Sequence, residues 1–92
     1  MSSTLSSKDL DACLALLPGW VEEGSEIVKT FAFSSYLDGI EFVNSVAHQA
    51  EAMNHHPDLV VGWRKVTVRL TTHSAGGITE LDLRLARNCD QC

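Results

Sequence analysis

The stretch "NHHPDLVVGWRKVTVRLTTH", residues 54–73, decides the fold of this chain. Pro57 cannot continue a helix, so the helical pattern that precedes it must end here. After the proline, "LVVGW" (59–63) and "VTVRLTT" (66–72) are typical of two strands joined around Arg64 and Lys65. In the second run, apolar and polar side chains alternate, with Val66, Val68 and Leu70 set against Thr67, Arg69 and Thr71. The stretch therefore predicts the end of a helix followed by a β-hairpin.

Three helices are marked by capping signals at their first residues. Each signal is a Ser or Thr followed three residues later by Asp, an arrangement that satisfies free amide groups of a first helical turn. The pairs are Ser6 with Asp9, Ser35 with Asp38, and Thr79 with Asp82. We expect the first helix to end at "PG" (18–19), the second to run toward Pro57, and the third to cover 80–87. An apolar stripe at helical spacing marks the second helix: Tyr36, Ile40, Val43, Ala47, Ala50 and Met53.

Two more strands are predicted on either side of Gly24-Ser25, at 20–23 and 26–33, because the second run is rich in β-branched and aromatic residues. The order is then α-β-β-α-β-β-α. It indicates an α+β fold, in which a four-stranded antiparallel sheet carries three helices on one face. We expect one domain over residues 1–92, with frayed tails at 1–5 and 88–92.

Composition excludes several classes of protein. The formal net charge is −5 with seven Lys and Arg residues, so direct binding of nucleic acid is not expected. No segment approaches the length needed to span a bilayer, and a cytoplasmic location is expected. Of three cysteines, Cys89 and Cys92 form a C-x-x-C pair. Without a second pair, it is interpreted as part of a tail rather than as a redox or metal site.

A cluster of histidines is the strongest candidate site. His55 and His56 lie between the second helix and the third strand, Glu51 lies one helical turn before His55, and His73 ends the fourth strand. We expect these residues to converge at one end of the sheet. Several imidazoles around one pocket can supply a proton donor and a proton acceptor, which suits an elimination or a hydration. Surface or capping histidines are the structural alternative, and a zinc site is disfavoured because adjacent histidines rarely point at one ion.

These residues also resemble a known family. The spacing of Glu51, His55-His56-Pro57, Trp63, His73 and Asp82 resembles the signature of the pterin-4a-carbinolamine dehydratases, also called dimerization cofactors of a hepatocyte transcription factor. The similarity extends to "LLPGW" after the first helix, to "KTFAF" in the second strand, and to "AHQAEAMNHHP". That family's fold has the same α-β-β-α-β-β-α order.

The resemblance implies dehydration of 4a-hydroxytetrahydrobiopterin, a pterin-4a-carbinolamine, to quinonoid dihydropterin and water, as in tetrahydrobiopterin recycling. It implies that His55, His56 and His73 form the acid/base and substrate-contacting set, and that Glu51 orients a histidine or the pterin. No metal, redox cofactor or other cofactor is implied, and the chain is expected to form a homodimer or a homotetramer. A non-catalytic binding or assembly protein of the same fold, with a protein partner, is the alternative.

Two positions of the signature have a structural explanation as well. The capping box accounts for Asp82, which could also orient His73 or line the pocket. Trp63 lies in a predicted strand, where an aromatic side chain is more often part of the core than stacked on a substrate. Both are retained as candidate substrate-binding or orienting residues.

Overall fold

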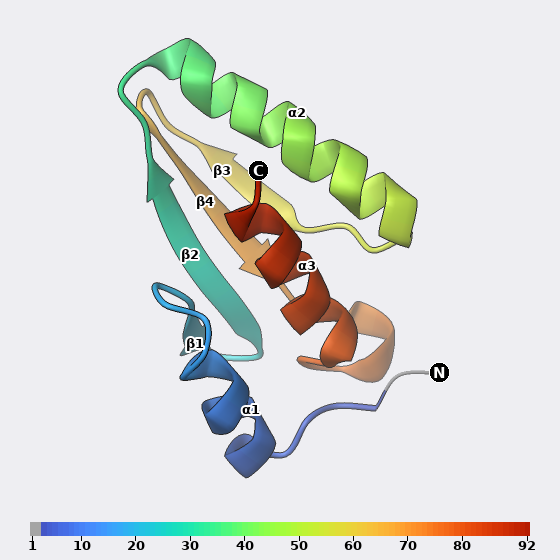
Figure 1. Cartoon of the computed structure of the whole chain (residues 1–92). Coiled ribbons are helices and arrows are strands. Elements are labelled where there is room, and N and C mark those ends of the chain that lie inside the picture. Colours follow the sequence, from blue (N-terminus) through green and yellow to red (C-terminus); the bar gives the residue numbers. More distant parts are fainter. Residues whose placement is uncertain (1–2) are drawn as a thin grey trace.

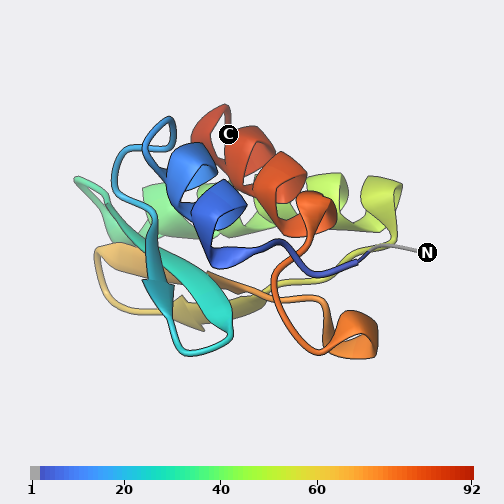
Figure 2. The same ribbon diagram turned by 90° about the horizontal axis from the view of Figure 1, so that it is seen from below.

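The computed structural model describes residues 3–92 and has the predicted α+β architecture (Figure 1). The elements are α1 (Ser7–Leu14), β1 (Val21–Glu23), β2 (Glu26–Ala32), α2 (Tyr36–Met53), β3 (Asp58–Val61), β4 (Lys65–Leu70), a short 3-10 helix η1 (His73–Ala75), and α3 (Glu80–Asp90). The strands form one antiparallel sheet in the order β1-β2-β4-β3. All three helices lie on the same face of this sheet (Figure 2). The predicted fold class is confirmed.

The three predicted capping residues begin their helices. The side chain of Ser6 accepts from the Asp9 amide at 3.1 Å, and that of Ser35 accepts from the Asp38 amide at 3.1 Å. Thr79 caps α3 within a capping box, in which the Asp82 carboxylate accepts from the Thr79 amide at 2.9 Å. The first residue of α3 is therefore fixed by the capping contacts that the sequence predicted.

The core lies between the sheet and the helices. Val66, Val68 and Leu70 of β4 are all buried, as the alternation predicts. The predicted stripe of α2 is correct only in part, because the helix buries Gly39, Phe42, Val46 and Ala50, of which the stripe contained Ala50 alone. Val43 and Met53 of the stripe are partly buried against the core. Tyr36 and Ala47 face solvent instead. Phe42 packs against Phe31 of β2 and against Phe33 just after this strand, with ring centroids 4.5 Å and 5.2 Å apart, so these aromatic contacts favour burial of the Phe42 face of α2.

The fourth strand ends earlier than predicted. β4 stops at Leu70, and an isolated bridge between Thr72 and Gly77 closes the following loop. His73 begins η1 and is therefore not part of the strand. Thr72 and His73 still follow the alternation of a strand, since the Thr72 side chain is buried and the His73 side chain is exposed.

The predicted frayed tail at 88–92 differs from the structure. α3 continues to Asp90 instead of ending at Arg87, and the Cys89 side chain is completely buried in the core. Lys29 of β2 pairs with Asp90 at 2.8 Å, so this last turn is attached to the sheet. At the other end of the chain, the predicted frayed segment 1–5 includes residues 1 and 2, which lie outside the described residues. Leu5 is anchored, since its amide donates to the Ile78 carbonyl at 2.9 Å.

The C-x-x-C pair consists of two free thiols, of which Cys89 is buried and Cys92 is exposed. Burial raises the pKa of the Cys89 thiol to about 12, and nearby Cys92 and Asp90 add to the shift. Burial also raises the pKa of Cys92. Both thiols therefore remain protonated near neutral pH, whereas redox-active cysteines have a lowered pKa. This supports the interpretation that the pair is not a redox site.

The raised pKa of Cys89 leads to a prediction about stability. The thiol has an ordinary pKa of 9.0 and a folded-state pKa of about 12, so its contribution is fully present below pH 9.0 and is lost as the pH rises toward 12. We expect the free energy of unfolding to fall more steeply across this interval in the unmodified protein than in Cys89→Ala. Urea denaturation at successive pH values measures both slopes, and equal slopes would contradict the assignment.

Among residues 3–92, no helix combines the length and the apolar character that a membrane crossing requires.

Candidate active site

The end of α2 determines how the two adjacent histidines point. Asn54 has a left-handed backbone conformation, with φ of 49°, and ends the helix three residues before Pro57. The His55 amide then donates to the Ala50 carbonyl at 3.0 Å, a helix-closing bond typical of a left-handed cap. This reversal directs His55 into the protein and leaves His56 at the surface. The helix ends before Pro57, as predicted, but the residue that ends it is Asn54, a signal that the sequence reasoning missed.

His55 is buried against the N-terminus of α3. Its Nε2 lies 2.6 Å from Oδ1 of Asp82, whose side chain has no exposed surface. Of the alternatives for Asp82, the structure supports a contact with a histidine, but this histidine is His55 and not His73. The residues come from separate parts of the chain, namely the loop after α2 and the first turn of α3.

The second oxygen of Asp82 is also occupied. Oδ2 accepts from the Thr72 hydroxyl at 2.8 Å and from the Thr79 amide at 2.9 Å. A carboxylate has only acceptors, so the bond to His55 requires a proton on Nε2 of the imidazole. In the neutral ring this leaves Nδ1 as the unprotonated nitrogen. The arrangement can therefore hold one tautomer of His55 and can stabilise the positive charge that the ring gains on accepting a proton.

His56 forms a second histidine–carboxylate pair in a different environment. Its Nε2 is hydrogen-bonded to Oε2 of Glu51, and both side chains are largely exposed. By the same reasoning Nε2 donates to the carboxylate, which leaves Nδ1 for other contacts. Adjacent residues thus carry one buried and one solvent-exposed imidazole, each oriented by its own acid.

His73 does not contact these two pairs. It lines an open hollow of ≈ 410 Å³ together with Glu23, Gly24, Ser25, Glu26, Thr71 and Gly76. Arg69 bonds to Glu23 at 2.9 Å and to Glu26 at 3.2 Å, and these two bonds, the first above all, raise the pKa of the guanidinium. The connection between His73 and the buried pair is indirect, since its neighbour Thr72 contacts Asp82. We expected Glu51, His55, His56 and His73 to converge. The structure instead places His55 with Asp82 and His56 with Glu51 in two neighbouring pairs, and His73 lies apart from both.

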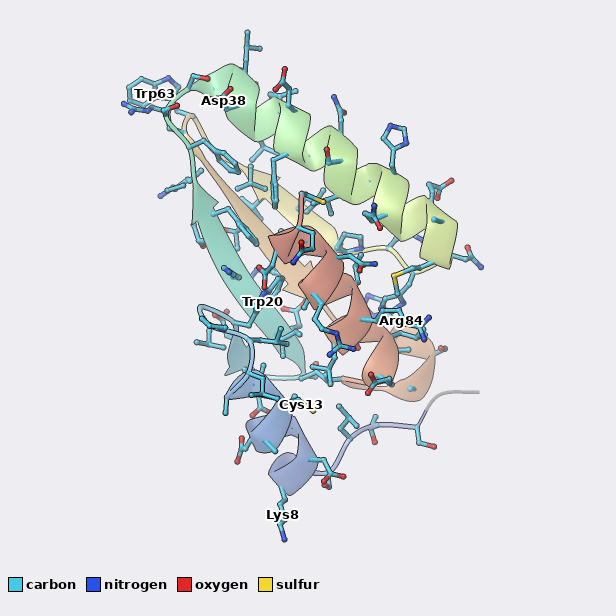
Figure 3. All side chains as sticks on the ribbon, in the orientation of Figure 1. Lys8, Cys13, Trp20, Asp38, Trp63 and Arg84 are labelled. Atoms are coloured by element: carbon cyan, nitrogen blue, oxygen red, sulfur yellow. The ribbon has the colours of Figure 1, made fainter. Side chains whose placement is uncertain are left out.

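Trp63 lies at the other end of the β3–β4 hairpin from the histidines. Figure 3 shows its ring at the edge of the molecule, near the beginning of α2, and 74% of its surface is exposed. The prediction of a core position is thus wrong, because Trp63 belongs to the turn after Val61 and not to a strand. Its ring has the Arg64 guanidinium over it at 5.2 Å, and it borders a hollow with Ala32, Phe33 and Lys65. Trp63 does not contact the histidines of the same chain.

One polar residue of the site was not predicted. Thr72 is buried, and its hydroxyl links Asp82 to the Thr79 hydroxyl, 2.8 Å away. The sequence could have indicated Thr72, because it continues the alternation of the buried residues Val66, Val68 and Leu70. A buried hydroxyl requires a hydrogen-bond partner. Over residues 3–92, no group of three or more ligating side chains is arranged to hold a metal ion.

Comparison with known proteins gives a consistent result. The family model described as "Pterin 4 alpha carbinolamine dehydratase" matches residues 3–92. A protein of Thermosynechococcus vestitus, named provisionally as a pterin-4-alpha-carbinolamine dehydratase, is 48% identical over 95% of this chain and 92% of its own length. A protein of Roseiflexus sp. with the same provisional name is 47% identical over 99% of this chain and 98% of its own length.

Solved structures agree in fold. A crystal structure described as a transcriptional coactivator/pterin dehydratase from Brucella melitensis has a TM-score of 0.93 and 31% sequence identity, with 97% of each chain covered. A pterin dehydratase-like protein, described as a RuBisCO assembly factor in the alpha-carboxysome, has a TM-score of 0.68 and 28% identity. It is matched over 79% of this chain and 87% of its own.

Proposed function

The chain belongs to the pterin 4 alpha carbinolamine dehydratase family, and on this premise we propose that it dehydrates 4a-hydroxytetrahydrobiopterin to quinonoid dihydropterin in tetrahydrobiopterin recycling. The observation that carries the proposal is the pair of histidine–carboxylate contacts on adjacent residues, His55 with Asp82 and His56 with Glu51. Such pairs supply what a dehydration needs, a group that accepts a proton and a group that donates one.

The proposed reaction breaks two bonds of the substrate. The bond between C4a and the hydroxyl oxygen breaks as that oxygen receives a proton, and the departing group is water. The N5–H bond breaks as a base takes the proton, and its electron pair forms the C4a=N5 double bond. Protonation matters because hydroxide is a poor leaving group, so general acid and base catalysis typically contributes about 10²–10⁴-fold. The chemistry consumes no redox equivalent and is proposed to use no cofactor and no metal.

The environments of the two imidazoles suggest a division of roles. His55 is proposed as the base, because Asp82 holds its Nε2–H and leaves Nδ1 to accept the N5 proton. Asp82 would then stabilise the resulting imidazolium. His56 is proposed as the acid, since its exposed ring can regain a proton from solvent after each turnover.

The remaining predicted residues are given supporting roles. Glu51 orients His56, with which it is paired. His73 is proposed to contact the substrate from the loop after β4, because it follows Thr72, which bonds to Asp82. Trp63 remains a candidate for substrate stacking only if a second copy of the chain brings it to this site, since within one chain it lies at the opposite end of the hairpin.

The proposed activity has a direct test. Chemically generated 4a-hydroxytetrahydropterin is mixed with the protein in a stopped-flow instrument, and the decay is compared with the spontaneous reaction. A rate that increases in proportion to the protein concentration supports the proposal. A decay equal to the uncatalysed one, with protein that is folded by circular dichroism, would remove it.

The alternative is a non-catalytic binding or assembly protein, and one observation favours it. Large apolar side chains are exposed near the beginning of α2 and the β3–β4 turn, namely Leu37, Tyr36 and Trp63. Surfaces of this kind mark sites of protein association. A folded protein without dehydratase activity would support this alternative, whereas an active protein would leave the surface available for a second role.

Association of the chain with itself is proposed for a related reason. β3 is an edge strand of the sheet, and Val60 and Val61 in it are 58% and 42% exposed. An uncovered apolar edge can pair with a strand of another molecule. We expect a homodimer or a homotetramer by light scattering at micromolar concentration, and Val60→Lys is expected to shift the mass toward the monomer. A monomeric unmodified protein would contradict this prediction.

A further inference from the structure

The hydroxyl of Thr72 occupies a defined place in a chain of buried hydrogen bonds. Thr72 is 5% exposed, and Thr79 and Asp82 are completely buried. Oγ1 of Thr72 lies 2.8 Å from Oδ2 of Asp82 and 2.8 Å from Oγ1 of Thr79. All three residues are therefore shielded from water, so each of their polar groups depends on the others.

The direction of these bonds follows from counting protons. A threonine hydroxyl has one proton, and an Asp82 carboxylate can only accept, so the proton of Thr72 goes to Oδ2. The contact between the two hydroxyls must then be donated by Thr79. Thr79 in turn accepts from the Leu81 amide at 3.2 Å. The order of donation is thus Leu81 amide, Thr79 hydroxyl, Thr72 hydroxyl, Asp82 carboxylate.

We propose that Thr72 is a positioning residue of this site, which fixes the rotation of the Asp82 carboxylate and thereby holds His55 in the tautomer with Nε2 protonated. The inference rests on the proposed function for its kinetic consequence only. Two donors, the Thr72 hydroxyl from the loop after β4 and the Thr79 amide at the start of α3, hold Oδ2. Oδ1 is consequently directed at Nε2 of His55, 2.6 Å away.

Removal of the hydroxyl changes this arrangement in a specific way. In Thr72→Val the Thr79 hydroxyl loses its acceptor, and Oδ2 of Asp82 loses one of its two donors. The carboxylate is then held by fewer donors and can rotate away from His55. The imidazole would lose the contact that selects its tautomer, so Nδ1 would be protonated in part of the molecules. Thr72→Ser retains the hydroxyl and should behave as the unmodified protein.

The experiment uses the resting protein and requires no substrate. Nitrogen-15 NMR of the histidine rings distinguishes protonated from unprotonated nitrogens. We expect one tautomer for His55 in the unmodified protein and in Thr72→Ser, and a mixture in Thr72→Val and in Thr72→Ala. Thr67→Val is the matched control, because Thr67 lies within β4, its hydroxyl pairs with that of Thr30, and its position alternates with the buried Val66 and Val68, so it faces away from the helices. Thermal unfolding followed by circular dichroism checks that each variant is folded.

The outcomes separate this inference from the proposed function. Identical ring signals for His55 in all the folded Thr72 variants would overturn the inference, whatever the activity. If the protein is a dehydratase, Thr72→Val should lower kcat about 10–100-fold with KM little changed, as for other residues that orient a functional group. An inactive unmodified protein would remove the proposed function, while the NMR result would still decide the role of Thr72. Thr72→Ala provides the same test if the larger valine prevents folding.

Discussion

His55→Ala is expected to slow the catalysed dehydration by about 10²–10⁴-fold, because it removes the proposed proton acceptor. His56→Ala should slow it within the same range by removing the proposed donor. The two variants are expected to differ in stability. His55→Ala should lose more stability, because His55 is the buried partner of Asp82. The His56 pair is exposed and contributes at most about 1 kcal/mol. Stopped-flow kinetics and urea denaturation measure both quantities on the same samples.

Suitable controls separate catalysis from packing. His55→Gln retains an N–H donor toward Asp82 but has no basic nitrogen, so the activity should be lost while most of the stability is kept. His48→Ala is the matched control for the exposed histidine, because His48 lies on the solvent side of α2 and outside both pairs. If the residues act together, the double variant His55→Ala/His56→Ala should lose less than the product of the single losses. Rates like those of the unmodified protein in both single variants would defeat the catalytic assignment.

Asp82→Ala is expected to have the largest effect on stability, about 3–5 kcal/mol, by removing a buried partner of several polar groups. The substitution leaves the Thr79 amide, the Thr72 hydroxyl and Nε2 of His55 without an acceptor. It also removes the acid of the capping box of α3. Equilibrium urea denaturation measures the loss, and a change below about 1 kcal/mol would contradict the central place given to this side chain.

Asp82→Asn separates the two functions of the carboxylate. The amide oxygen can still accept from Thr72 and Thr79, so α3 should remain capped. The amide NH₂ group would face Nε2 of His55 and can only donate, which favours the opposite tautomer of the ring. The proton would then occupy Nδ1, the nitrogen proposed to receive the substrate proton. We expect Asp82→Asn to lose much activity and little stability. If Asp82→Asn lost as much stability as Asp82→Ala, a structural role alone would be supported.

The elements of the fold were predictable where a local signal determines them. Ser35 and Thr79 begin their helices because a side-chain cap acts within three residues, and β4 shows its buried face through simple alternation. The phase of α2 was not predictable, since several apolar residues lie on each side of the helix and contacts with Phe31 and Phe33 select among them. The length of α3 was missed because the C-x-x-C spacing indicated a tail, although Cys89 fills the core.

The sequence placed several candidate residues close together, but it did not predict their contacts. Spacing predicted that Glu51 lies near His55 and His56, and the family resemblance added Asp82, but neither showed which acid contacts which histidine. That pairing depends on the left-handed conformation of Asn54, which turns two neighbouring side chains in different directions. The position of His73 depends on the point at which β4 ends, and alternation alone could not locate this point. Similarity to a family can therefore indicate which residues belong to a site, but the backbone conformation at Asn54 determines which carboxylate each histidine contacts.

The position of Asp82 also has a consequence for how the protein unfolds. One carboxylate joins the first turn of α3, the loop after β4 and the loop after α2. Fraying of α3 from its N-terminus would expose all of these bonds at once, so a folded state with only the site disordered is costly. Heat inactivation should therefore coincide with cooperative loss of the whole domain rather than precede it.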